Sequence, residues 1–185
     1  MTHLARTQFG NPVLRRVCRS LSPAEITSAE IQTLLNDMKS TLIDNKLGIG
    51  LAAPQVGKPI GVAVIAIRPT AHRPPVKPFD LVLINPLITK PQGEKYEMWE
   101  GCISAGSNGT ADLFAKVPRY KQITVQYLDE HGKSHTKSFA GLKAQVVQHE
   151  VDHLNGILFV DHVTNPKTYM TYSEYMNRIR KVQSL

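Results

Sequence analysis

Cysteine is scarce in this chain, and long apolar runs are missing. Only two of the 185 residues are cysteines, which is too few for a disulfide framework and favours a reducing compartment, so we expect a cytoplasmic protein. The longest apolar run covers residues 60–67, far short of the roughly 18 to 20 residues of a membrane span. The first residues lack the apolar core of a signal peptide. These absences exclude secreted, disulfide-rich and membrane-spanning proteins.

Runs of like charge are also missing, although the chain is basic. Lysine and arginine total 22 against 15 acidic residues, which gives a formal net charge of +7. The basic residues are spread along the sequence, and no run reaches the five or six like charges that mark a nucleic-acid arm. We therefore expect a solvated basic surface and no specific DNA binding. A non-enzymatic protein that binds ribosomal RNA is one alternative compatible with this charge.

Hydrophobic periodicity predicts an α+β protein with mostly antiparallel sheet. The length and the 42% hydrophobic content fit one domain over residues 1–185. Apolar residues at helical spacing follow a capping box that begins at Thr27, and Gly48 offers a helix stop. Helices and strands do not alternate strictly, so antiparallel pairing is expected. The predicted helices cover residues 29–47, 142–155 and 172–182, and the predicted strands cover 60–67, 81–85 ending at Pro86, and a hairpin over 123–139.

The most informative segment is HEVDH at residues 149–153, on the second predicted helix. Positions i and i+4 lie about 40° apart around a helix, so His149 and His153 can bind one metal ion. Glu150 stands beside them and can take a proton from metal-bound water, whose pKa the ion lowers. The same helix face is otherwise apolar. Buried histidine and glutamate side chains need partners, and an ion supplies them.

A third protein ligand would leave one open coordination position for water, and two residues qualify. Glu174 lies downstream, as in some metalloproteases, but it also fits a capping box at the start of the last helix. Cys102 lies upstream, beside Gly101 and other short residues suited to a strand end. Glu174 would favour a small metalloendopeptidase. Cys102 would give a thiolate and two imidazoles, a set that suits iron and zinc alike.

A third segment, GIGLAAPQ at residues 48–55, matches neither the dinucleotide nor the phosphate-loop fingerprint. Its small residues would let the backbone crowd a cleft, while the Gln55 amide donates a hydrogen bond. In this order the three segments resemble the motifs of the peptide deformylase family, G-x-G-L-A-A-x-Q, E-G-C-x-S and H-E-x-D-H, at residues 48–55, 100–104 and 149–153. The resemblance spans nearly the whole chain, starting at residues 10–15.

The resemblance implies mostly antiparallel sheets packed around a central metal-binding helix. It also implies a hydrolase that removes the formyl group from the N-terminal methionine of nascent polypeptides and releases formate. We expect a monomer, and transient ribosome contact is a hypothesis that rests on Arg178, Arg180 and Lys181 in the basic last helix. The cofactor would be one divalent ion, Fe²⁺ by expectation, with Zn²⁺, Ni²⁺ or Co²⁺ as substitutes. The implied ligands are Cys102, His149 and His153, the catalytic groups Glu150, Gln55 and the backbone N–H of Ile103, and the substrate-binding residues Gly50, Ile49, Leu142 and Val146.

Two features lie beside these motifs. Residues 105–116 form a longer connection than is usual in the family, and we expect a loop there that flanks the cleft. Arg119 matches an arginine of the family's V-P-R segment. It could face the substrate, but we expect a structural role.

Overall fold

The computed structural model describes residues 3–44, 48–69, 76–106 and 111–183. Its sheet has the order β1-β2-β3-β4-β5 with β6 beside β4, and these strands pair antiparallel throughout the described part of the chain, which confirms the predicted α+β class. The helices are α1 (Pro23–Ile26), α2 (Ala29–Asp44), α3 (Leu142–Leu154) and α4 (Tyr172–Gln183), and the strands are β1 (Gly50–Ala52), β2 (Val62–Ile67), β3 (Phe79–Gly101), β4 (Leu113–Leu128), β5 (Ser134–Ala140) and β6 (Met170–Thr171).

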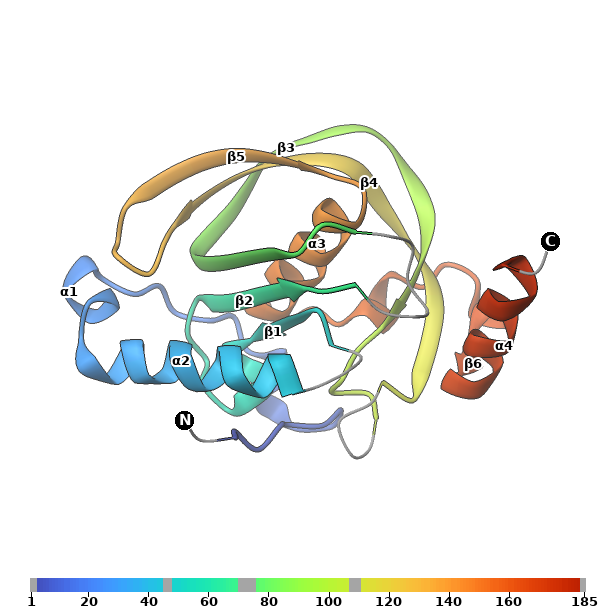
Figure 1. Cartoon of the computed structure of the whole chain (residues 1–185), viewed down its shortest axis with the longest axis horizontal. Helices are drawn as coiled ribbons and strands as arrows, with labels where there is room; N and C mark the ends of the chain where they lie inside the picture. The colour runs from blue at the N-terminus through green and yellow to red at the C-terminus, as the bar shows by residue number, and fades with distance from the viewer. Residues whose placement is uncertain (1–2, 45–47, 70–75, 107–110, 184–185) are drawn as a thin grey trace.

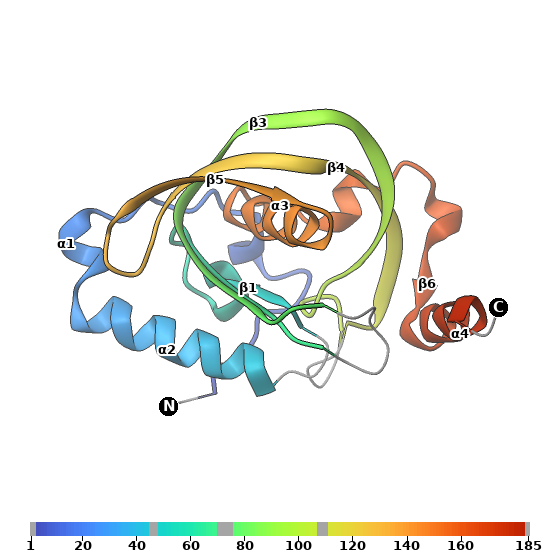
Figure 2. The ribbon, with the colours of Figure 1, turned by 45° about the horizontal axis from the view of Figure 1, so that its top comes forward.

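Helix α3 occupies the centre of the molecule. The long strands β3 and β4 curve over it together with β5 (Figure 1), and the turned view shows α3 nearly end-on beneath them, with β1 on its other side (Figure 2). Helix α2 packs on the opposite face of β1, β2 and the first part of β3, so two apolar clusters form, one on each face. The second cluster includes Ile49, Leu142 and Val146. These are three of the residues that the family resemblance assigns to substrate binding.

Strand β3 is much longer than the sequence predicts. The expected end at Pro86 is wrong, because the strand continues for another fifteen residues as part of a ribbon with β4. Proline cannot donate a ladder hydrogen bond, and a register shift next to it accommodates this loss. Asn85 adopts a φ of 49° there, and its side chain exchanges hydrogen bonds with the backbone N–H and carbonyl of Leu21. The strand bends at this bulge and does not stop.

The start of α2 also differs in detail from the prediction. Ser28, not Thr27, is the capping residue, because its hydroxyl accepts the backbone N–H three residues further on. The complete capping box lies one helix earlier, where Ser22 and Glu25 bond each other's backbone N–H at the start of α1. Residues 45–47, the last turn of the predicted helix, lie outside the described residues.

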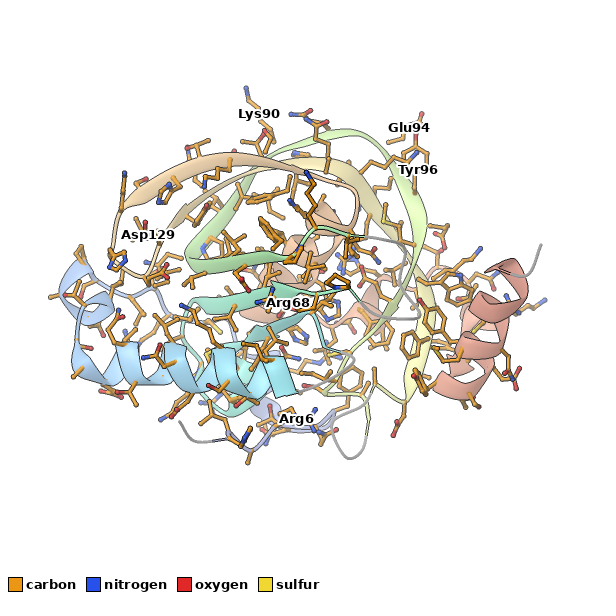
Figure 3. The ribbon with its side chains drawn as sticks, viewed as in Figure 1. Arg6, Arg68, Lys90, Glu94, Tyr96 and Asp129 are labelled. Carbon is orange, nitrogen blue, oxygen red and sulfur yellow. The ribbon has the colours of Figure 1, made fainter. Side chains whose placement is uncertain are left out.

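The C-terminal half follows the predicted order of elements. The hairpin is present as β4 and β5, but β4 begins at Leu113, so residues 113–116 of the expected loop over 105–116 belong to a strand; residues 107–110 lie outside the described part. Helix α4 packs on β4 through Tyr175, whose ring stacks on Phe114 at 4.2 Å. Lys90 and Glu94 point outward from the bend of β3 (Figure 3). No helix among the described residues is long and apolar enough to cross a membrane.

Candidate active site

Three side chains from two distant segments meet beside α3. Cys102 directly follows β3, and His149 and His153 project from α3; one ligand atom from each lies within 4.8 Å of the other two. The Cys102 Sγ and the His153 Nε2 are 3.2 Å apart. At Gly101, directly before this cysteine, a Cβ would lie 2.7 Å from the Phe114 ring, so glycine lets Phe114 pack against the end of β3. Among the described residues this is the one group of three or more such side chains with the spacing for a metal ion.

Glu174, the alternative third ligand, lies elsewhere. It stands in the first turn of α4 with an exposed side chain, and it does not belong to the cysteine–histidine group. A glutamate-completed metalloendopeptidase site is therefore wrong for this fold. The physical reason is topological, because α4 packs on the far side of β4 while α3 lies inside the curve of the sheet (Figure 1).

The donor set fits a divalent metal ion. A thiolate and two imidazoles occupy three positions of a tetrahedron and leave the fourth open. Two polar atoms at the site, the His153 Nδ1 and the Glu150 Oε2, are buried and have no protein hydrogen-bond partner. Burial lowers the pKa of His153 well below its usual value, which keeps its imidazole neutral, as a metal ligand requires.

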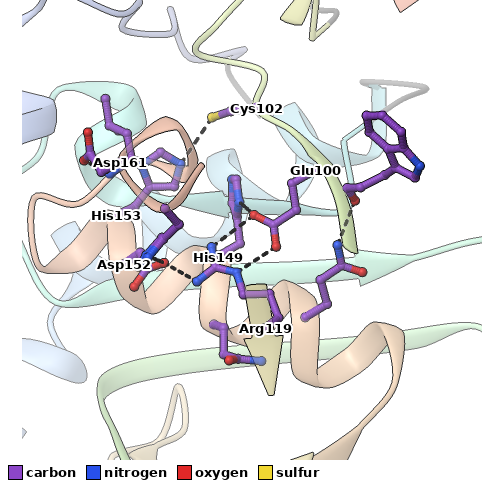
Figure 4. A network of polar contacts seen from close by, with 12 residues as sticks. Glu100, Cys102, Arg119, His149, Asp152, His153 and Asp161 are labelled. Carbon is purple, nitrogen blue, oxygen red and sulfur yellow. Dashed lines mark hydrogen bonds and ion pairs between the residues drawn. The ribbon is translucent and has the colours of Figure 1, made fainter. Parts of the chain in front are cut away.

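A buried polar network holds His149 in place (Figure 4). The Glu100 carboxylate lies 2.9 Å from the His149 Nδ1, which leaves Nε2 of that ring for the ligand group. Arg119 donates to both oxygens of Glu100, at 2.8 and 3.0 Å, and to Asp152 at 2.5 Å. Asp152 in turn lies 2.9 Å from the His162 Nε2. Arg119 is 3% exposed, so its position is structural and it does not line an open cleft.

Sequence reasoning did not assign this supporting role to Glu100, Asp152 or His162. A usable signal was present, because Glu100 stands two residues before Cys102 and Asp152 immediately precedes His153. Metal-binding histidines commonly donate a hydrogen bond from the second ring N–H to a carboxylate. Which carboxylate serves which histidine depends on the pairing of β3 with β4, and that pairing is not visible in the sequence.

The pKa values of the two glutamates at the site are shifted in opposite directions. Burial disfavours the charge on Glu100, but the hydrogen bonds and charges of His149 and Arg119 outweigh it and lower the pKa of this carboxyl to about 2. Glu150 has no such partner, and burial raises the pKa of its carboxyl to about 7. Glu100 is thus a permanent anion, while Glu150 can exchange a proton near neutral pH.

Gln55 lies against the cysteine. It sits in a short 3-10 helix, Ala53–Val56, and is 1% exposed. Its Oε1 accepts the backbone N–H of Ala52 at 2.7 Å, and its Nε2 donates to the Cys102 Sγ at 3.4 Å and to the Ser104 Oγ at 3.2 Å. Ile103 follows the cysteine directly and is also buried. The amide side chain and the peptide after the cysteine are therefore brought to the same place.

Gly50 brings β1 into contact with α3. A Cβ at this position would overlap the Glu150 carboxylate, so only glycine lets the strand pass this close. Ile49 and Leu142, both partly buried, pack in the same cluster as Val146. The described structure thus groups Cys102 with the two histidines, sets Gln55 against Cys102 and places Gly50 against Glu150, whereas Glu174 does not join this group.

Fold and site together define a class. A buried cysteine–histidine–histidine group, with a glutamate on the same helix and a curved antiparallel sheet around it, is the arrangement of an α+β metallohydrolase.

Comparison with known proteins identifies the family within this class. Residues 5–169 match the family model for polypeptide deformylase. "Peptide deformylase 2" of Nostoc sp. is 35% identical over 178 residues, with 94% of this chain and 93% of the relative covered. The peptide deformylase of Rhizobium meliloti is 38% identical over 165 residues, with 89% and 87% covered. A Met-Ala-Ser-bound structure of class I type b peptide deformylase from Acinetobacter baumannii superposes with a TM-score of 0.80 at 32% identity, covering 88% of this chain and 99% of that one.

The chain therefore belongs to the peptide deformylase family, the hydrolases that remove the N-formyl group from nascent polypeptides. The resemblance drawn from the three sequence motifs is confirmed.

Proposed function

We propose that this chain deformylates formyl-methionine peptides at the group formed by Cys102, His149 and His153. The observation that carries the proposal is that one ligand atom from each of these three residues, of which Cys102 and His153 are buried and His149 partly buried, lies within 4.8 Å of the others, beside a glutamate oxygen that has no protein partner. A divalent ion held there would act as a Lewis acid that polarises the formyl carbonyl and makes water more acidic. We expect Fe²⁺, and the same donors accept Zn²⁺, Ni²⁺ or Co²⁺.

Glu150 is proposed to transfer a proton from the attacking water to the departing amine. Its carboxylate takes a proton from the attacking water as the water oxygen bonds to the formyl carbon. When the carbon–nitrogen bond breaks, the same carboxyl passes the proton to the departing amine, so formate and a free N-terminus are produced. The support is its place on α3 next to His149 and its buried, unpartnered Oε2.

Gln55 and Ile103 are proposed to stabilise the negative charge that develops on the formyl oxygen. The Gln55 Nε2 and the backbone N–H of Ile103 would both donate to that oxygen, and their support is that both flank Cys102. The backbone of Gly50 would hydrogen-bond the peptide. The methionine side chain would occupy an apolar pocket lined by Ile49, Leu142 and Val146.

The working context of the enzyme follows from its substrate. We propose a cytoplasmic monomer, with residues 1–185 as one catalytic domain, that meets nascent chains by transient contact with the ribosome. The net charge of +7 favours an encounter with ribosomal RNA. Helix α4 would supply part of this contact through Arg178, which lies 5.6 Å from the Trp99 ring; the side chains of Arg180 and Lys181, which the sequence adds to this basic group, lie outside the described part of the structure.

The deciding experiment measures formate release from a formyl-methionine peptide by protein prepared without oxygen. We expect turnover that a chelator abolishes and that Fe²⁺, Ni²⁺ or Co²⁺ restores. Exclusion of oxygen matters because an iron-bound cysteine is open to oxidation. No formate with any of these ions would contradict the proposal.

Two variants test the roles of single residues. Glu150→Gln keeps all three ligands, so we expect it to retain its metal while turnover falls by about 10² to 10⁴. Wild-type turnover in this variant would remove Glu150 from the reaction. Cys102→Ala is expected to lose metal, whereas Glu174→Ala, whose side chain is exposed, serves as the matched control and keeps it.

A further inference from the structure

Ser104 is a fully buried polar residue that the reaction as proposed above does not use. It stands two residues after the ligand Cys102 and is 0% exposed. Its Oγ accepts the Gln55 Nε2 at 3.2 Å, and its backbone N–H lies 3.4 Å from the Cys102 Sγ as donor. We propose that Ser104 is a positioning residue that aims the Gln55 amide at the reacting oxygen of the substrate. This inference rests on the proposed role of Gln55 as an oxyanion donor.

The hydrogen bonds of Gln55 fix which end of its amide faces the site. The Oε1 accepts the Ala52 backbone N–H at 2.7 Å, and a nitrogen in that place would face another donor. The Nε2 must therefore point toward Cys102 and Ser104. An amide nitrogen carries two hydrogens. The Nε2 donates to the Ser104 Oγ and, more weakly, toward the Cys102 Sγ, so the donor faces the group where the formyl oxygen would lie in the proposed reaction.

A second observation shows that the N-terminal segment fixes the positions of Gln55 and Ser104 relative to each other. The backbone N–H of Thr7 donates to the Gln55 carbonyl at 2.8 Å, and the backbone N–H of Phe9 donates to the Ser104 carbonyl at 2.8 Å. One N-terminal segment therefore bonds to both backbone segments, the one that carries the Gln55 amide and the one that carries the Ser104 hydroxyl. The distance between them is set by the backbone and not by the rotamers of two side chains alone.

Loss of the Ser104 hydroxyl would change the orientation of the Gln55 side-chain amide, while the amide would remain buried. The remaining acceptor for the Nε2 within the protein would be the Cys102 Sγ at 3.4 Å, a weak acceptor. A buried N–H without a partner is costly, so the amide would rotate to find one. The charge on the formyl oxygen develops only in the transition state. Misalignment should therefore lower kcat and leave KM nearly unchanged.

The test is a double-mutant cycle between Ser104→Ala and Gln55→Ala in metal-loaded protein. We expect Ser104→Ala to lower kcat about tenfold, less than the roughly 10² to 10³ that losing an oxyanion donor costs, with KM changed less than about twofold. In the Gln55→Ala background the same change is expected to have no further effect, because the group through which Ser104 acts is gone. Ser104→Thr retains the hydroxyl and is expected to recover most of kcat.

Thr41→Val is the matched control. Its hydroxyl is also buried and accepts a backbone N–H, that of Leu4, but it lies on α2 away from the ligand group. We expect its kcat to equal that of the wild type. Metal content and thermal unfolding are measured for every variant. If Ser104→Ala loses its fold, Ser104→Gly removes the same hydroxyl with no added atom and enters the cycle in its place.

A readout independent of turnover is the side-chain amide resonance of Gln55 in zinc-loaded protein, identified by its absence from Gln55→Ala. We expect its protons to exchange slowly in the wild type and faster in Ser104→Ala, with no change in Thr41→Val. Equal and additive losses from the two mutations, or an unchanged Gln55 resonance in Ser104→Ala, would overturn the inference while leaving the proposed reaction intact. If Gln55→Ala retains full kcat, both the role of Gln55 and that of Ser104 are wrong, whereas deformylation itself still stands.

Discussion

Replacing Arg119 by methionine would leave the buried carboxylate of Glu100 and the partly buried carboxylate of Asp152 around an apolar side chain. In the wild type the guanidinium makes two hydrogen bonds to Glu100 and one to Asp152, and it is 3% exposed. It is the cation that these two anions share. Glu100 in turn bonds the Nδ1 of His149, so the change reaches the proposed metal site through one intermediate residue.

The expected loss of stability is large. Removing one partner of a buried ion pair costs about 3 to 5 kcal/mol, because the remaining charge loses its compensation. For a chain of this size each kcal/mol corresponds to about 2 to 4 °C in melting temperature. Arg119→Met is therefore expected to melt about 6 to 20 °C below the wild type. Its metal affinity should also fall by about 10- to 100-fold, since the carboxylate that orients His149 is no longer held.

Thermal unfolding of metal-loaded protein at pH 7 measures the first effect, and competition with a chelator measures the second. Arg15→Met is the matched control, because Arg15 pairs with Asp161 at the surface, where an ion pair contributes at most about 1 kcal/mol. Arg119→Lys keeps the charge but not the planar fork and should fall between the two. If Arg119→Met melted no lower than Arg15→Met, Glu100 and Asp152 would not depend on this guanidinium, and the reasoning would be refuted.

Three further outcomes are expected. Gly50→Ala should lower kcat by at least about tenfold, because the new Cβ must displace the Glu150 carboxylate; an unchanged kcat would mean that β1 yields freely. Burial opposes the charge of Asp129, but the hydrogen bonds from His135 and from the backbone N–H groups of Lys133 and His131 together outweigh it and lower the pKa of Asp129 to about 2. Urea unfolding of Asp129→Asn should show a lower free energy of unfolding than the wild type at pH 7. This difference should shrink as the pH falls from about 4 toward 2, because the carboxyl of the wild type is then protonated; a difference independent of pH would exclude this cause. Burial raises the pKa of the Cys18 thiol to about 11, so a maleimide at pH 8 should label it roughly a hundredfold more slowly than a free thiol; labelling at the free-thiol rate would refute its burial.

The ligand-bearing helix could be predicted from local sequence because its signals are local. Residues 142–154 combine helical spacing with the HEVDH segment, and Gly156 stops the helix with a φ of 71°. The hairpin of β4 and β5 could be predicted for the same reason, since alternation and a turn lie within a few residues of each other. Strand β2 was predicted two residues too long at its start.

The features that could not be predicted depend on contacts between distant segments. Strand β3 continues past Pro86 because β4 pairs with it on both sides of a bulge. The local sequence shows the strand-breaking proline but not this pairing partner. The choice between Cys102 and Glu174 needed either a family resemblance or the topology that places α4 outside the sheet. The bond between Arg119 and Glu100 joins the middle of β4 to the end of β3, so no local pattern announces it.

The bend of β3 over α3 also ties metal binding to folding. Cys102 stands at the end of a 23-residue strand, and the histidines arrive on a helix that the chain makes only after β4 and β5. The ligand atoms converge only when the whole ribbon has closed over α3, so the unfolded chain has no equivalent site. An ion bound in this way adds RT ln(1 + [M]/Kd) to the free energy of unfolding. Metal should therefore raise the midpoint of global unfolding of the whole fold, and a chelator should lower it again.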